Sequence, residues 1–154
     1  MEYVIVKWVH VLSSTVLFGT GLGSAFYMFF TNRSRNVVAI AVVARRVVVA
    51  DWLFTTPTAI LQPLSGAWLV HLAGFPWTSR WILWSVVLYA IAGLCWLPVV
   101  CIQIRMARMA EHAAAQGAAL PEVFWRYHAV WTALGWPAFT AFVGIFYLMV
   151  AKPA

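Results

Sequence analysis

The sequence predicts an all-α integral membrane protein, folded as one four-helix bundle with both termini on the outer, periplasmic side. Hydrophobic residues make up 64% of the 154 residues and charged residues only 9%, whereas soluble domains carry about 25% charged residues. The apolar residues gather in long runs, and Lys and Arg concentrate in two of the connections between these runs. A soluble fold is excluded, because it would need more charge to cover its surface.

Each of four apolar runs is long enough to cross a bilayer, which takes roughly 20 helical residues. In a single domain covering 1–154, we expect spans at about 3–30, 47–73, 81–104 and 129–150. The connections are then 31–46 and 105–128, and the latter is expected to be the one substantial polar loop. Residues 37–50 are apolar but carry Arg45 and Arg46. They predict a helical extension of the second span whose arginines reach the lipid headgroups.

The distribution of Lys and Arg predicts the orientation. Seven basic residues fall in the connections after the first and third spans: Arg33, Arg35, Arg45, Arg46, Arg105, Arg108 and Arg126. Only three, Lys7, Arg80 and Lys152, fall on the opposite side. Because cytoplasmic loops carry an excess of basic residues, both of those connections are placed in the cytoplasm. The predicted location is the bacterial cytoplasmic (inner) membrane, where anionic lipid explains the net charge of +6 and no nucleic-acid partner is needed.

Three glycines lie close together in the first span. Gly19, Gly21 and Gly23 permit close approach of a neighbouring helix or of a flat cofactor. They do not predict a nucleotide-binding loop, since no strand precedes them. Helix packing alone explains most glycine patterns of this kind, so both interpretations stay open.

His10 is the residue that points most directly to chemistry. It lies inside the first span, where ionisable residues are rare and usually functional. We expect it to bind a ligand or handle a proton; a structural hydrogen bond to another helix is the alternative. Lys7, one turn earlier, can pair with a carboxylate group of a ligand or simply reach the membrane interface.

His71 lies near the outer end of the second span, within about one helical turn of the depth of His10. Two histidines at one depth on neighbouring helices are what haem b needs for axial ligation, so His10 and His71 form a candidate metal site. The position of His71 around the helix is unfavourable for this pairing. In a regular helix His71 lies nearly opposite the polar stripe from Asp51 to Gln62, unless a kink at Pro63 rotates the outer half of the second span. His71 is otherwise an interfacial side chain.

A second group of polar residues is expected toward the cytoplasmic face. Asp51 and Gln62 share a stripe of the second span, Gln103 lies at the end of the third, and His128 opens the fourth. Such a cluster can bind a quinone head group or relay protons, with helix-end capping as the alternative for His128. No motif of hydrolases, kinases or nucleic-acid-binding proteins is present.

The first span resembles the first helix of HemJ-type protoporphyrinogen oxidases, which bind haem b. The resemblance rests on Lys7 and His10, followed by Gly19 and Tyr27, and it implies that His10 is a haem ligand. Those enzymes also use a lysine in a later helix, whereas spans two to four contain no lysine before Lys152. Protoporphyrinogen oxidation therefore does not follow from the resemblance. Copper-resistance membrane proteins of the CopD type are similar more loosely.

Over nearly its whole length the chain resembles a bacterial family of predicted four-helix membrane proteins without a settled function, domain of unknown function 2269. The shared stretches are Asp51-Trp52-Leu53-Phe54-Thr55, Gln62-Pro63, Cys95-Trp96-Leu97-Pro98, Gln103-Ile104-Arg105 and Gly135-Trp136-Pro137. This resemblance implies no role for any residue.

The sequence as a whole favours a haem-b membrane protein that passes electrons to or from a quinone or porphyrinogen-type substrate. Whether the chain is an enzyme stays open. One alternative is a non-catalytic structural or assembly subunit of a membrane complex, with aromatic and glycine faces used only for packing. Another is a small-molecule or metal-ion transporter built as a homo-oligomer.

Overall fold

The computed structural model describes residues 1–153, and every regular element in that range is helical, which confirms the all-α expectation. In chain order the elements are α1 (Glu2–Arg33), α2 (Val37–Ala50), η1 (Asp51–Thr55), α3 (Thr56–Ala73), α4 (Arg80–Gln116) and α5 (Glu122–Ala151). The element η1 is a single π-helical turn, in which the N–H of Thr56 bonds to the carbonyl of Asp51 five residues earlier. Both of its ends keep right-handed helical dihedrals, so α2, η1 and α3 form one continuous rod.

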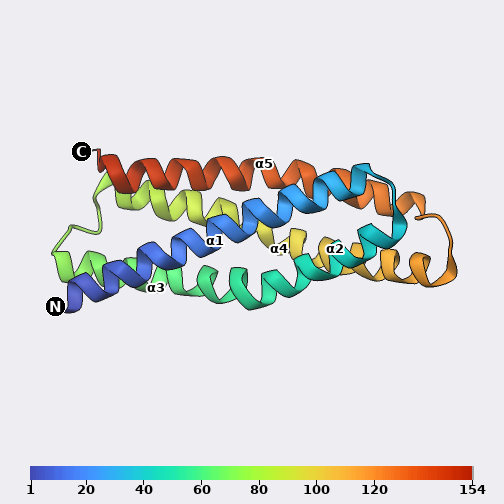
Figure 1. The fold of residues 1–154 in the computed structure, drawn as a ribbon. Helices are drawn as coiled ribbons and strands as arrows, with labels where there is room; N and C mark the ends of the chain where they lie inside the picture. Colours follow the sequence, from blue (N-terminus) through green and yellow to red (C-terminus); the bar gives the residue numbers. More distant parts are fainter. Residues whose placement is uncertain (154) are drawn as a thin grey trace.

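The helices lie along one long axis, with the N- and C-termini at the same end (Figure 1). The connection between α3 and α4 lies at that end, and the α1–α2 and α4–α5 connections lie at the other. The main contacts pair α4 with α5, α2 with α4 and α1 with α3. Gly144 marks how closely α4 and α5 approach, because a Cβ there would lie 3.0 Å from Cδ1 of Leu88.

Three helices, α1, α4 and α5, are long and apolar enough to cross a membrane, judged by length and composition. The connections are shorter than the sequence suggested. Residues 105–116 continue α4 as a helix, because this Ala-rich stretch has no Gly or Pro before Gly117. Gly117 ends the helix with a φ of +62°, a left-handed conformation that glycine adopts easily. The expectation of a substantial polar loop at 105–128 is therefore wrong. Most of this segment is helical, and only the short turn between Gln116 and Glu122 connects α4 to α5.

The other connection is similarly short. Residues 37–50 form the expected helical extension of the second span, and the side chain of Asn36 begins it by accepting from the N–H of Ala39 at 3.1 Å. Rather than lying alone at the interface, α2 packs against α4 and buries Ile40 and Ala44.

Pro63 lies inside α3, and its missing N–H frees the carbonyl of Ala59 four residues earlier. The phenol of Tyr89 on α4 donates to that carbonyl at 2.5 Å. A freed carbonyl in an apolar environment needs a partner, so this bond both tolerates the proline and joins α3 to α4.

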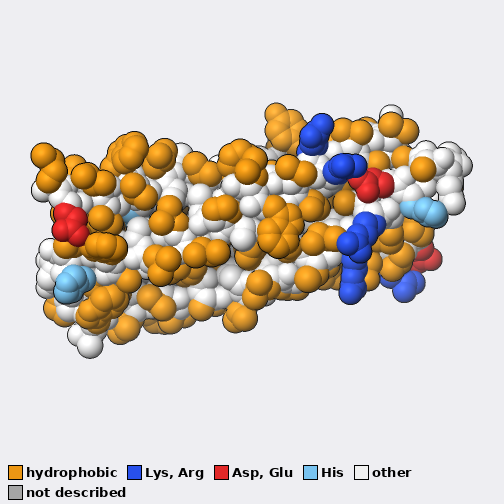
Figure 2. All heavy atoms as spheres, turned by 90° about the horizontal axis from the view of Figure 1, so that it is seen from below, with side chains coloured by type: hydrophobic (Ala, Val, Ile, Leu, Met, Phe, Trp, Pro, Cys, Tyr) orange, Lys and Arg blue, Asp and Glu red, His pale blue; other side chains and the backbone are white. Residues whose placement is uncertain are grey.

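The apolar core lies at the end of the molecule that carries α2. Its fully buried members include Ile40, Met106, Ala110 and Phe124. Along the rest of the molecule large apolar side chains face outward; Leu94, for example, is 70% exposed. Figure 2 shows these apolar side chains covering most of one face, while the basic side chains on it gather in the half with α2. Near the opposite end this face shows acidic and histidine side chains and no Lys or Arg. This distribution suits a protein whose middle is surrounded by lipid.

We predict that Phe124→Ala lowers the free energy of unfolding by about 3–5 kcal/mol, because it removes a fully buried aromatic ring and leaves a cavity. Thermal or denaturant unfolding in detergent measures the effect. Val123→Ala, at the exposed neighbour, is the control and should stay within about 0.5 kcal/mol of the unchanged protein. Equal losses in both variants would contradict the position of the core.

Candidate functional site

Two polar clusters lie between the helices. The first, the His10 cluster, joins α1 to α3 through His10, Ser13, Gln62 and Ser65. The Nδ1 atom of His10 lies 2.8 Å from Oγ of Ser65. The hydroxyl of Ser65 in turn donates to the carbonyl of Leu61 at 2.7 Å. With the serine proton assigned to that bond, Ser65 accepts from His10. In this assignment Nδ1 carries the imidazole proton and Nε2 keeps its lone pair.

The amide of Gln62 holds the same turn of α1 in place. Its nitrogen donates to the carbonyl of His10 at 2.8 Å and to the hydroxyl of Ser13. Gly66 gives the ring its space, since a Cβ there would lie 3.3 Å from Cε1 of His10. Three residues of α3 thus hold His10: Ser65 bonds to the ring, Gln62 bonds to its backbone, and Gly66 lets the ring lie close to the helix. Ser13, Ser65 and Gly66 were not expected as partners of His10. The sequence signals them only by helical spacing: Ser65 and Gly66 follow Gln62 by three and four residues, and Ser13 follows His10 by three.

The other residues expected near His10 lie elsewhere. His71 is exposed and comes six positions after Ser65, about 240° around the helix. Lys7 is exposed, and its Nζ lies 5.9 Å from the ring centre of Tyr3. The described residues hold no group of three His, Cys, Asp or Glu side chains that could bind a metal ion. The structure therefore does not bring His71 or Lys7 into the His10 cluster.

Gly19, Gly21 and Gly23 do not serve packing within the chain. A Cβ added at any of them would meet no atom within 4 Å. The expectation that they admit a neighbouring helix is not met by a helix of this chain, which leaves that surface of α1 open.

The second cluster, the Asp51 cluster, lies where η1 meets α4 and α5. Asp51 is 5% exposed, and its Oδ1 accepts from the hydroxyl of Thr55 at 3.0 Å. With its amide oriented to suit both neighbours, Gln103 donates to Oδ2 of Asp51 at 2.7 Å. The Gln103 oxygen then accepts from Nε1 of Trp131 at 3.2 Å. Both carboxylate oxygens are satisfied by neutral donors, and within residues 1–153 no basic side chain pairs with Asp51.

His128 extends the Asp51 cluster toward α1. Its ring stacks on Trp131 with centres 5.8 Å apart, and its Nδ1 accepts from the amide of Asn32 at 3.1 Å. The structure thus brings Asp51, Gln103 and His128 into one cluster, while Gln62 belongs to the His10 cluster. Trp131 and Asn32 were not expected in this cluster. A tryptophan in an apolar run suggests a packed core residue, and an asparagine at a helix end suggests a helix cap.

This arrangement can exchange protons or hold a polar head group. A carboxylate buried without a cation is costly, and inside a membrane such a residue usually has a function. It also lies on a π-helical turn, an element that occurs frequently at functional sites. The distance from Asp51 to Ser65 is 14 residues along the rod, about 21 Å at 1.5 Å per residue, so the two clusters act at different depths.

We predict that Gln103→Leu destabilises the protein by about 1–3 kcal/mol, because it leaves Oδ2 of Asp51 and Nε1 of Trp131 without partners. Unfolding in detergent measures the change. Gln116→Leu, at an exposed position of the same helix, is the matched control. If Gln103→Leu leaves stability unchanged, the hydrogen bonds of this cluster do not hold the helices together.

Comparison with known proteins agrees with an integral membrane protein. The model of a family described as a predicted integral membrane protein (DUF2269) matches residues 4–153. No curated protein and no solved structure matches the chain. Since the match covers almost every residue, the chain belongs to the DUF2269 family of predicted integral membrane proteins.

Proposed function

We propose that the chain crosses the bacterial cytoplasmic membrane four times as a helix bundle with both termini outside. On the three long helices, the basic residues that bound the apolar stretch lie about 25 residues apart, or about 38 Å at 1.5 Å per residue. These pairs are Lys7 and Arg33, Arg80 and Arg105, and Arg126 and Lys152. A stretch of that length exceeds the roughly 30 Å hydrocarbon core.

The rod α2–η1–α3 has a comparable stretch between Arg46 and His71, in which Asp51 is the one charged residue. Its continuity through η1 supports a fourth crossing. The excess of Arg at the end with α2 supports placing that end in the cytoplasm.

Cysteine labelling tests this topology. In a variant that lacks Cys95 and Cys101, single cysteines at Arg33, Thr78 and Gln116, all exposed, are treated with a membrane-impermeant maleimide in intact cells. We expect labelling at position 78 alone, and labelling at 33 and 116 only after the membrane is opened. Labelling of position 116 in intact cells would reverse the orientation.

We further propose that the protein is a haem-b membrane protein with a redox role, in which His10 is the axial ligand. The observation that carries the proposal is the hydrogen bond from Nδ1 of His10 to Ser65. Metal-binding histidines almost always donate their second ring N–H to a neighbouring acceptor, and within residues 1–153 Nε2 of His10 has no hydrogen bond. A haem brings its own four nitrogen ligands, so one protein ligand suffices and no larger group of metal-binding side chains is needed.

Bound there, haem b would supply one-electron transfer. The residues of the chain would do the rest: Ser65 would fix the ring tautomer, Gln62 the position of the α1 turn, and Gly66 the space beside the ring. Oxidation of a quinol or porphyrinogen also releases protons, and the Asp51 cluster is the group suited to exchange them. Because it lies at a different depth, it would act on protons or a quinone head group and not on the haem ligand.

His10→Ala should abolish or strongly shift the Soret and α/β bands of the purified protein while the protein still inserts, because insertion depends on total apolar content. Ser65→Ala keeps the ligand but removes its acceptor, and should weaken haem binding about 10–100-fold. His71→Ala should leave the bands unchanged if ligation is by one histidine. His112→Ala, at an exposed histidine of α4, is the matched control.

A non-catalytic assembly subunit is the second candidate. The open face at Gly19 and Gly23 favours it, because such glycines allow another helix to approach closely. If the unmutated protein takes up no haem when haem is supplied, or if His10→Ala keeps a wild-type spectrum, His10 is structural. The assembly subunit then becomes the preferred function.

A further inference from the structure

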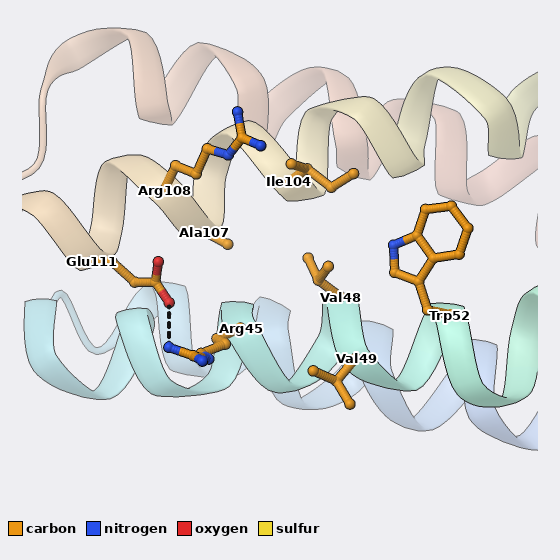
Figure 3. Close-up of a pocket in the computed structure, with 8 residues that line it drawn as sticks. All are labelled: Arg45, Val48, Val49, Trp52, Ile104, Ala107, Arg108 and Glu111. Atoms are coloured by element: carbon orange, nitrogen blue, oxygen red, sulfur yellow. Dashed lines mark hydrogen bonds and ion pairs between the residues drawn. The ribbon is translucent and has the colours of Figure 1, made fainter.

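A groove between α2 and α4 is not used by either polar cluster. It has a volume of about 460 Å³, and its floor includes Val48 and Ile104. Figure 3 shows the Arg45–Glu111 pair across one end of the groove and Trp52 at the other end. Arg108 lies on α4 near the charged end, with its guanidinium group directed away from α2. The groove therefore changes from charged to apolar along its length.

The charged end is suited to an anion. Arg45 and Glu111 form an ion pair at 3.4 Å, with side chains 73% and 42% exposed, and exposed pairs of this kind are weak. Arg108 has no ion pair within residues 1–153. Two guanidinium groups against one carboxylate leave the groove with a net positive charge. Guanidinium groups bind phosphate oxygens through paired, directional hydrogen bonds.

The groove also lies at the right depth for a lipid headgroup. Arg45 and Arg108 lie at the end of the stretch without basic residues, where the helices leave the hydrocarbon core. Trp52 and Ile104 lie just inside that stretch, nearer the middle of the molecule. Tryptophan favours the boundary between headgroups and acyl chains. A molecule with a phosphate at one end and a hydrocarbon chain at the other would match both parts of the groove.

We propose that this groove binds one anionic glycerophospholipid. Its phosphate is held at the charged end by Arg45 and by Arg108 once that exposed side chain turns toward the groove, and the first part of an acyl chain lies along Val48, Ile104 and Trp52. Basic pockets between membrane helices bind anionic headgroups by this chemistry. The apolar floor favours a lipid over free phosphate, which would leave most of the groove unused. Glu111 competes with the lipid phosphate for Arg45, so the bound lipid replaces the ion pair.

Native mass spectrometry of the detergent-solubilised protein tests the proposal by titration with phosphatidylglycerol or phosphatidylcholine. We expect one tightly bound phosphatidylglycerol and no such preference for phosphatidylcholine. Arg45→Gln and Arg108→Gln should each weaken binding about fivefold, the effect of one basic residue near an anionic surface. Glu111→Gln should strengthen it, because the competing carboxylate is gone.

Arg126→Gln is the matched control. It makes the same change of charge at the same end of the molecule, at an exposed arginine paired with Glu122 on α5 and outside the groove. If it weakens binding as much as Arg45→Gln, the preference comes from diffuse surface charge and the proposal fails. If inorganic phosphate displaces the lipid at millimolar concentration, the groove is a site for a free anion and the lipid assignment is overturned.

Discussion

The carboxylate of Asp51 is the group on which the arrangement of the helices most depends. It is buried inside the protein, so its hydrogen-bond partners must come from the chain. Thr55 supplies one, Gln103 of α4 supplies the other, and Gln103 in turn accepts from Trp131 of α5. These bonds fix how each rod is rotated about its own axis. The π-helical turn at Asp51 adds to this, since one extra residue rotates the following helix by roughly 100°. As a result α2 faces α4 while α3, in the same rod, faces α1.

The two halves of the molecule are held together by different forces. At the end with α2, where the helices extend beyond the stretch without charges, Ile40, Met106 and Phe124 form a core of the kind that water drives together. In the other half the outside is apolar too, so burial of apolar side chains gives little net gain. Specific contacts replace it there: the Tyr89 bond to the carbonyl that Pro63 frees, the close approach at Gly144, and the hydrogen bonds of the His10 cluster.

Composition and periodicity were enough to predict a helical membrane protein, because the cost of an unpaired backbone in lipid leaves few other structures. They did not predict the features that depend on contacts between helices. The carbonyl freed by Pro63 is bound by a tyrosine of another helix, and no pattern within one helix reveals that partner. Asp51, Gln103 and His128 were expected together because all three lie near one end of their spans. Trp131 links Gln103 to His128, and Asp51 joins them from a π-helical turn. The residue types of Asp51–Thr55 do not reveal that turn.

The position of His10 illustrates how neighbouring residues on one helix can determine the chemistry of a residue on another. The hydroxyl of Ser65 is bound to the carbonyl of its own helix, so its oxygen is left to accept. That direction fixes the proton on Nδ1 of His10 and leaves Nε2 as the free atom. Gln62, one turn before Gly66, binds the backbone of the same residue and prevents the α1 turn from sliding. A histidine that served only to join two helices would need the Ser65 bond alone. The ring is held by Ser65 through Nδ1, its backbone is held by Gln62, and Gly66 lets the ring lie close against α3. A ring held in this way is also what the proposed haem ligand would require.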